Sequence, residues 1–409
     1  MKNTFIARHP SVLIFLACLA VFTLVVTLMS HAYGTGGLST SFVKTLGRTL
    51  CLCLVALAMD LVWGYCGILS LGHFAFFGLG GYMIGMWLMY ARTEIIVTES
   101  LANSPIPPTA QEVQDAIGTQ IFGVVGSSDF PLIWSFAHSL TLQLLLVLLI
   151  PGVLALVFGW LAFRSRVTGV YLSILTQAMT LALSLYLFQN ESGLRGNNGL
   201  SGLQNLPGVS AGQDAISVWF LWASALALGL GYLLAAWVVS GKFGSVVRGI
   251  RDDEARVRFL GYSVEGYKLF IFTLTAIIAA IAGALYYPQA GIINPGEVAP
   301  IASIYLAVWV AIGGRGRLYG AVIGAAVVSL VSTWFTGGLV PALNLGFYRI
   351  DWVDWWLVLL GLSFVLVTLF APKGIGGLFD LVTDRMAPNR HGADYGPDKG
   401  SLREGEGQE

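Results

Sequence analysis

The sequence predicts an all-α polytopic membrane protein with about ten transmembrane helices, some of them broken or half-spanning. Of its 409 residues, 56% are hydrophobic and 11% are charged, whereas about 25% of the residues in a soluble domain are charged. Ten apolar runs alternate with polar stretches, and most are long enough to cross a bilayer core of about 30 Å, which takes about 20 helical residues. The formal net charge is zero, so nothing indicates a nucleic-acid partner.

The first apolar run extends from Ser11 to Met29, and we interpret it as the first span. The alternative is a signal peptide cleaved after Ala32, because Ser-His-Ala resembles a small-x-small cleavage site. The run at 298–314 is the weakest, since its apolar part would rise only about 18 Å as a helix, and it predicts a broken or half helix buried in protein. The other runs cover residues 45–64, 67–91, 132–162, 167–188, 217–240, 267–288, 318–337 and 353–371.

The basic residues predict the orientation of these spans. With a cytoplasmic N-terminus, 17 of the 22 Lys and Arg residues lie on the cytoplasmic side and five on the other, as the positive-inside rule expects. Both termini are then cytoplasmic, and residues 92–131 and 189–216 form long loops on the outer side, the first with a short helix at 109–118. We expect residues 1–378 to form one transmembrane domain and the polar segment 379–409 to be a disordered cytoplasmic tail.

The stretch 241–268 lies between two apolar runs and holds ten of the 44 charged residues, so it must lie in water. Gly244 and Ser245 are suited to cap a helix and Gly261 to end one, which predicts a short helix over 246–260. Apolar residues recur near helical spacing, and charges of both signs cover the rest of the surface. This pattern is typical of a helix that lies along the membrane and presents a charged surface to a protein. An ordinary solvated loop is the alternative.

Two glycine-rich regions interrupt the apolar runs. Residues 63–82 carry six glycines, and a second Gly/Pro-interrupted region covers 288–325. Small residues let helices approach closely or break without exposing backbone to lipid, and paired interrupted segments point to a transport site at their interface. Close packing alone is the alternative, and His73 is more typical of a hydrogen-bonded packing residue than of a proton relay. The candidate path residues are Gly67, Ser70, Gly72, His73, Gln177, Gln289, Asn294, Glu297, Gly313 and Gly314.

Motifs for enzymatic chemistry are absent from the sequence, including the phosphate-binding loop, His-Glu-x-x-His and Gly-x-Ser-x-Gly. The four cysteines lie in or beside apolar segments, without the spacing of a metal site or a disulfide framework. We therefore expect no catalytic residue, metal or cofactor. Energy for transport must come from a partner or a gradient, and the scarcity of charge at membrane depth favours a partner over an ion-coupled secondary transporter or channel.

Several motifs resemble one family. Residues 252–286, DDEARVRFLGYSVEGYKLFIFTLTAIIAAIAGALY, are similar to the cytoplasmic loop and following helix of ABC-importer permeases for branched-chain amino acids and urea, although Arg256 stands where that loop motif has a second alanine. The run from Gly64 to His73 resembles the most recognisable signature of the family. GIINP, Glu297 and GGRG at 313–316 also have close counterparts there, so the resemblance covers about 44 to 378.

The resemblance implies a permease subunit of an ATP-driven importer in a bacterial inner membrane, surrounded by membrane lipid. Its implied partners are a second related permease in a heterodimer, two cytoplasmic ABC ATPase subunits and a periplasmic substrate-binding protein. Docking on the ATPase would use Arg251, Asp252, Asp253, Glu254, Ala255 and Gly261.

The urea branch of the family, and its second permease subunit in particular, looks more similar to this chain than the amino acid branch, through residues 308–316, 333–336 and 367–375. The expected substrate is therefore urea, and branched-chain amino acids are the alternative. Gln177, Gln289 and Asn294 agree with a neutral diamide because they offer amide partners rather than fixed ion pairs.

Overall fold

The computed structural model describes residues 10–34, 36–102, 109–123, 131–167, 169–209, 212–337, 341, 343–344, 349–370 and 374–377. The predicted tail at 379–409 lies outside the described residues, as do parts of the loop at 92–131.

The described chain is helical almost throughout, and its strands are only two residues long. Eight helices are long and apolar enough to cross a membrane, and two shorter apolar helices bring the described total to ten, which confirms the predicted fold class. The α-helices are α2 (Pro10–Met29), α3 (Thr40–Asp60), α4 (His73–Ala102), α5 (Ala110–Phe122), α6 (Leu140–Arg164), α7 (Val170–Phe188), α8 (Gln213–Ser240), α9 (Lys242–Asp252), α10 (Glu254–Phe259), α11 (Val264–Ala290), α12 (Pro300–Gly313), α13 (Leu318–Thr336) and α14 (Trp352–Phe370).

Short elements join these helices. The strand β1 (Leu200–Ser201) pairs antiparallel with β2 (Ile292–Ile293), and β3 (Leu343–Asn344) pairs with β4 (Arg349–Ile350). The single-turn segments are the π-helical η1 (Leu61–Tyr65), which continues α3, and the 3₁₀ turns η2 (Leu132–Phe136), η3 (Asn190–Ser192), η4 (Gly196–Asn198) and η5 (Pro295–Val298).

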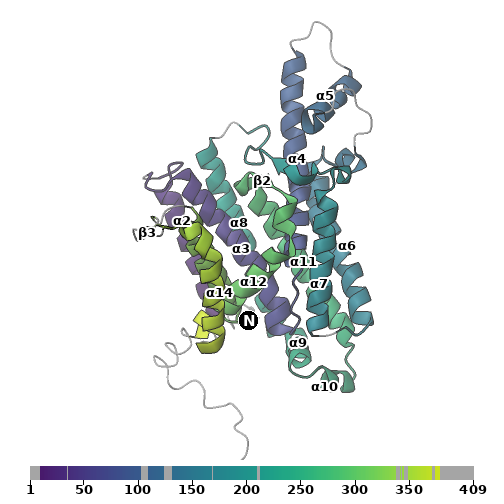
Figure 1. The fold of residues 1–409 in the computed structure, drawn as a ribbon, viewed down its shortest axis with the longest axis vertical. Helices are drawn as coiled ribbons and strands as arrows, with labels where there is room; N and C mark the ends of the chain where they lie inside the picture. Colours follow the sequence, from purple (N-terminus) through teal and green to yellow (C-terminus); the bar gives the residue numbers. More distant parts are fainter. Residues whose placement is uncertain are drawn as a thin grey trace, which may run out of the picture.

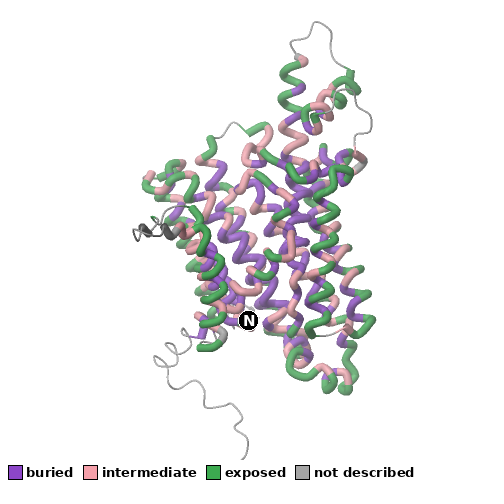
Figure 2. Tube along the Cα trace, in the orientation of Figure 1, coloured by how far each residue is buried: buried purple, intermediate pink, exposed green. Residues whose placement is uncertain are grey.

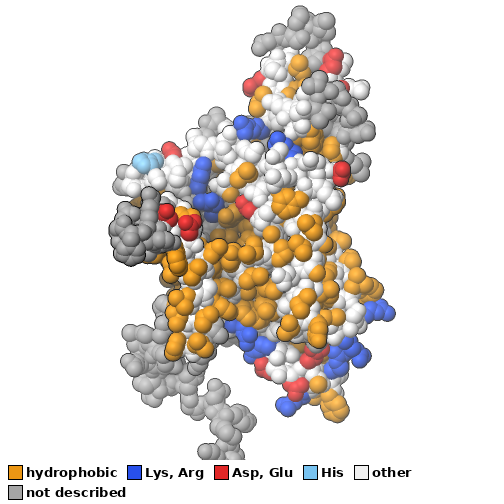
Figure 3. Space-filling model, viewed as in Figure 1, with side chains coloured by type: hydrophobic (Ala, Val, Ile, Leu, Met, Phe, Trp, Pro, Cys, Tyr) orange, Lys and Arg blue, Asp and Glu red, His pale blue; other side chains and the backbone are white. Residues whose placement is uncertain are grey.

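The bundle is built around α3, which is buried along most of its length, whereas α2, α6 and α7 expose apolar side chains (Figure 2). Hydrophobic side chains cover the middle of the face in Figure 3, with charged side chains gathered beyond them at both ends. An apolar belt bounded by charge is the surface expected of a protein that crosses a bilayer.

The central helices cross at glycines. A methyl group at Gly80 of α4 would overlap the backbone of Ala280 in α11, and one at Gly283 of α11 would overlap the carbonyl oxygen of Phe77. Small residues at such crossings let two backbones touch, which is the usual device of membrane helices.

The two predicted long loops and the charged stretch lie at opposite ends of the bundle. The end of α4 and all of α5 project beyond the other helices, and β2 lies toward that end, whereas α9 and α10 lie at the opposite end (Figure 1). We call these the α5 end and the α10 end. The helix predicted at 109–118 is present as α5, where Thr109 and Glu112 form a reciprocal capping box.

Several predicted boundaries differ from those in the structure. The single helix predicted over 246–260 is two helices, because Asp253 is extended (φ −157°) and its carboxylate caps α10 by accepting from the Arg256 N–H at 3.0 Å. The first of them begins at Lys242, ahead of the predicted caps Gly244 and Ser245. The span predicted at 67–91 becomes helical only at His73. Gly261 is left-handed (φ 89°), as expected of a residue that ends a helix.

Candidate functional site

Two helices begin inside the bundle, and their first turns meet. The Phe74 N–H at the start of α4 donates a hydrogen bond of 3.1 Å to Ser303 Oγ in the first turn of α12. The chain before α4, at 66–72, is not helical, and neither is the connection from β2 to η5 before α12. The two interrupted regions predicted from glycine content therefore converge, and the partly positive N-terminal ends of two helices lie close together.

A chain of polar side chains lies under this junction. His73 Nδ1 is 3.2 Å from Ser70 Oγ, and His73 Nε2 is 3.2 Å from Thr275 Oγ1. The Thr275 hydroxyl also donates its hydrogen to the Phe272 carbonyl at 3.0 Å. Ser70, His73 and Thr275 are fully buried, and Thr275 lies about 16 Å along α11 at a rise of about 1.5 Å per residue. His73 is therefore a hydrogen-bonded residue of the packed interior.

The helix α7 holds the non-helical segment in place. Ser173 Oγ donates to the Leu69 carbonyl at 2.7 Å, and Thr176 Oγ1 accepts from the Leu71 N–H at 3.0 Å. These two residues were not predicted, yet the sequence carries a signal for them. Hydroxyl residues recur at three- or four-residue spacing along one buried face of an otherwise apolar helix, namely Ser173, Thr176, Thr180 and Ser184.

The predicted amide and carboxylate candidates do not join this cluster. Gln177 is half-buried on α7 and makes no side-chain hydrogen bond to the described residues. Asn294 and Glu297 are half-buried near the β2–η5 connection. Gln289 is buried near the end of α11, where its Nε2 donates to Ser224 Oγ at 3.0 Å and to the Leu285 carbonyl at 2.7 Å.

The predicted glycines lie where neighbouring helices or turns come into close contact. Gly67 has a left-handed backbone (φ 78°) and lies against Arg251 of α9. A methyl group at Gly313 would overlap the Gly320 carbonyl, so α12 and α13 touch there, and Gly314 follows with φ 108°. Gly72 faces the side chains of α7, with Thr180 Oγ1 3.2 Å from the position of a Cβ.

At the α10 end, the predicted coupling residues form a folded helix pair. Glu254 Oε2 is 2.5 Å from Lys268 Nζ and Glu254 Oε1 is 2.9 Å from Arg258, whose other nitrogen is 2.5 Å from Glu265. Hydrogen bonds to Glu265 and Glu254 raise the pKa of Arg258. Glu254 therefore fastens α10 to α11 instead of projecting toward a partner.

Apolar and charged side chains beside this ion-pair network remain exposed. Phe259 is 92% exposed and Leu260 68% exposed, and Ala255, Asp252 and Asp253 also face outward. Large exposed apolar side chains mark a surface that contacts another protein or the membrane. Phe259 and Leu260 were not among the predicted coupling residues.

Arg251 connects the helix pair to the broken helix. Its Nη1 donates a hydrogen bond of 2.8 Å to the Gly64 carbonyl at the end of η1, while its Nε is held at 2.9 Å by Asp252. On the other side of the same turn, buried Asp60 accepts from the Gly316 N–H at 2.7 Å. The α9–α10 pair, the turn before α4 and the turn after α12 are therefore in direct contact.

Comparison with known proteins agrees with this architecture. The model of the family described as "branched-chain amino acid transport system / permease component" matches residues 41–368. This chain belongs to that family. The matched range includes both interrupted segments and the α9–α10 pair. All the predicted site residues of this permease therefore lie within it.

Several curated relatives are similar to this permease. A high-affinity branched-chain amino acid transport system permease protein, LivM of Escherichia coli K12, is 27% identical over 281 residues, 62% of this chain and 61% of LivM. BraD of Pseudomonas aeruginosa, with the same description, is 22% identical over 81% of this chain and 93% of BraD. The inner membrane ABC transporter permease protein YjfF of Escherichia coli K12 is 25% identical over 41% of this chain and 54% of YjfF. No solved structure matches.

Proposed function

We propose that this permease is the membrane-spanning subunit of an ATP-driven importer in a bacterial inner membrane. It pairs with a second, related permease and works with two cytoplasmic ABC ATPase subunits and a periplasmic substrate-binding protein. The observation that carries the proposal is the hydrogen bond from Arg251 to Gly64, because it ties an exposed charged helix pair to the interrupted helices inside the bundle.

The contacts around Arg251 suggest how ATP hydrolysis on the partner subunits is coupled to movement of the transport path. The ATPase docks on α9 and α10 through their exposed residues, and Glu254 and Lys268 make this pair move as one body with α11. Displacement of Arg251 then shifts the turn at Gly64 and, through Asp60, the turn at Gly316. The turn at Gly64 comes shortly before the start of α4, and the turn at Gly316 follows the end of α12, whose first turn holds Ser303. Movement of the two turns therefore opens the Phe74–Ser303 junction to one side or the other.

We propose urea as the substrate. The polar groups at the junction are neutral, and the two helix N-termini favour a carbonyl oxygen. Gln289 lies about 21 Å further along α11 than Thr275, at a rise of about 1.5 Å per residue. Its buried Oε1 has no hydrogen-bond partner among the described residues and is a second, separate acceptor for amide N–H groups. A small diamide needs such donors and acceptors and no fixed opposite charges.

Branched-chain amino acids are the second candidate, and the names of LivM and BraD favour them. The carboxylate of an amino acid is also stabilised by helix N-termini. The ammonium group of the amino acid can approach the carboxylate of Glu297, which is half-buried at the β2–η5 connection.

Uptake by intact cells separates the candidates. Deletion of the gene is expected to abolish high-affinity uptake of labelled urea at low external concentration and to leave leucine uptake unchanged, with a plasmid copy restoring urea uptake. The opposite pattern assigns the permease to branched-chain amino acids. If the deletion changes neither urea uptake nor leucine uptake, both substrate assignments are wrong, and short-chain amides are then tested in the same assay.

The orientation is part of the proposal, with the α10 end cytoplasmic, and single cysteines test it. The cysteine-free chain is expected to react with an impermeant thiol reagent on intact spheroplasts when cysteine replaces exposed Gln111 in α5 or exposed Asn197 in η4. The turn η4 lies just before β1, which pairs with β2. The cysteine variant of exposed Ser245 is expected to react only in inverted vesicles. Labelling of position 245 from outside would reverse the topology.

A further inference from the structure

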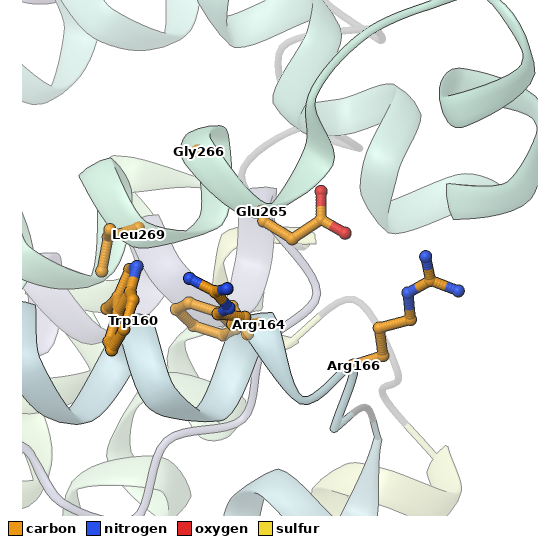
Figure 4. Close-up of a pocket in the computed structure, with 7 residues that line it drawn as sticks. Trp160, Arg164, Arg166, Glu265, Gly266 and Leu269 are labelled. Carbon is orange, nitrogen blue, oxygen red and sulfur yellow. The ribbon is translucent and has the colours of Figure 1, made fainter.

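A pocket of about 370 Å³ lies between the last turn of α6 and the first turn of α11, at the α10 end of the bundle. Figure 4 shows Arg164 and Trp160 on α6, Arg166 just beyond its end, and Glu265, Gly266 and Leu269 on the facing turn of α11. None of these residues has a part in the proposed transport path. The volume is within the range of small-molecule sites, about 300–1,000 Å³.

The pocket carries an excess of positive charge. The guanidinium groups of Arg164 and Arg166 make no ion pair or hydrogen bond with the described residues, and Arg164 lies over the Trp160 ring, 5.1 Å from its centroid. The one acid in the lining, Glu265, is bound by Arg258 from outside the pocket at 2.5 Å. Arg258 is paired with this carboxylate, and Arg166 acts on it electrostatically without an ion pair. The pocket therefore holds more positive than negative charge.

Two backbone features of the pocket also favour a bound anion. Arg166 has a left-handed conformation (φ 55°) that is uncommon for arginine, and its side chain extends toward the side of Glu265 in Figure 4. The first N–H groups of α11 begin at the opposite wall, where a helix favours negative charge.

The mouth of the pocket continues into the lipid-facing surface. Leu156 and Leu161 on α6 and Phe270 on α11 are about half exposed, as is Trp160 itself. Tryptophan is enriched where a membrane meets water, and basic pockets between membrane helices suit phospholipid head groups. A ligand with an anionic head and apolar chains fits both parts of this surface.

We propose that this pocket binds the phosphate of an anionic phospholipid, with Arg164 and Arg166 on the phosphate and the acyl chains lying along α6 beside Trp160 and Leu269. The bound head group lies next to Glu265, one ion pair away from α10. The site does not depend on the identity of the transported substrate.

Native mass spectrometry of the full-length permease in detergent tests the proposal. The first phosphatidylglycerol is expected to bind in preference to phosphatidylcholine, and the double variant Arg164→Gln/Arg166→Gln is expected to weaken phosphatidylglycerol binding roughly tenfold or more, since each basic residue near a membrane surface contributes about 1 kcal/mol. The matched control is Lys242→Gln/Arg256→Gln, which removes two exposed positive charges from the α9–α10 pair.

Three results would overturn the proposal. One is an equal loss in the control, because the attraction would then be general. Another is phosphatidylglycerol binding unchanged in the pocket variant. The third is complete displacement of the lipid by millimolar inorganic phosphate, which would assign the pocket to a soluble anion. Retention of the lipid in phosphate, with loss only in the pocket variant, supports the phospholipid.

Discussion

The substitution Arg251→Met is expected to lower substrate-stimulated ATP hydrolysis by the assembled transporter about tenfold or more, because a hydrogen bond from a charged group contributes about 1.5–3 kcal/mol. The Nη1 hydrogen bond to the Gly64 carbonyl is lost, and the turn before α4 is then released from α9. Methionine keeps much of the length of the side chain, so the effect reports the lost hydrogen bond rather than a cavity. The measurement is ATPase activity in nanodiscs with and without the loaded binding protein.

Arg256→Met is the matched control for this prediction. Arg256 lies in the same helix pair, is 80% exposed and makes only a long ion pair of 3.6 Å with Asp253. Because Arg256 lies on the proposed docking surface but has no link to Gly64, we expect this variant to lose clearly less stimulation than Arg251→Met. Equal losses in the two variants would show that the surface charge matters and the link to Gly64 does not.

The second large effect concerns stability. Gly283→Ala is expected to destroy the tight crossing of α11 on α4, because the added methyl group overlaps the Phe77 carbonyl and neither backbone can move freely. Overpacking typically costs about 1–3 kcal/mol, and a backbone clash lies at or above the upper end of that range. The readout is the fraction of monodisperse permease that survives heating in detergent, measured by size exclusion.

Gly361→Ala provides the comparison for this variant. Gly361 lies in α14, and nothing lies within 4 Å of an added Cβ. Alanine in a helix interior is more stable than glycine by roughly 0.5–1 kcal/mol, so this variant should survive heating at least as well as the wild type. Survival of Gly283→Ala at the same level would mean that the α4–α11 crossing is looser than the structure indicates.

The spans could be predicted from the sequence because an apolar run of sufficient length has few alternatives to a membrane helix. The short run at 298–314 was also interpreted correctly as a half helix, and it is α12 (Pro300–Gly313). The break at Asp253 was missed because the apolar spacing on either side fits one helix. Aspartate caps a helix as readily as it occupies a polar face, and only the tertiary contact of Glu254 with Lys268 selects the cap.

The candidate site was predicted in part. Ser70 and His73 stand in a recognisable local run, and both lie at the junction of the interrupted helices. Their partners Thr275 and Ser303 follow more than 200 residues later, on segments that look like ordinary apolar helices. A single sequence carries no signal for such pairings. The glycines could be picked out from the sequence, but their role could not. Gly313 was a candidate for the transport path, whereas in the structure Gly313 and Gly320 bring α12 against α13.

The pairing of β1 with β2 has a consequence for biogenesis. The backbone of Ile292 and Ile293 lies outside any helix, beside Gly81 of α4, and it pairs with Leu200 and Ser201. The pairing satisfies backbone groups that no helix satisfies. Because residues 292–293 follow 200–201 by some ninety residues, this pairing can form only after α8 and α11 have both been synthesised.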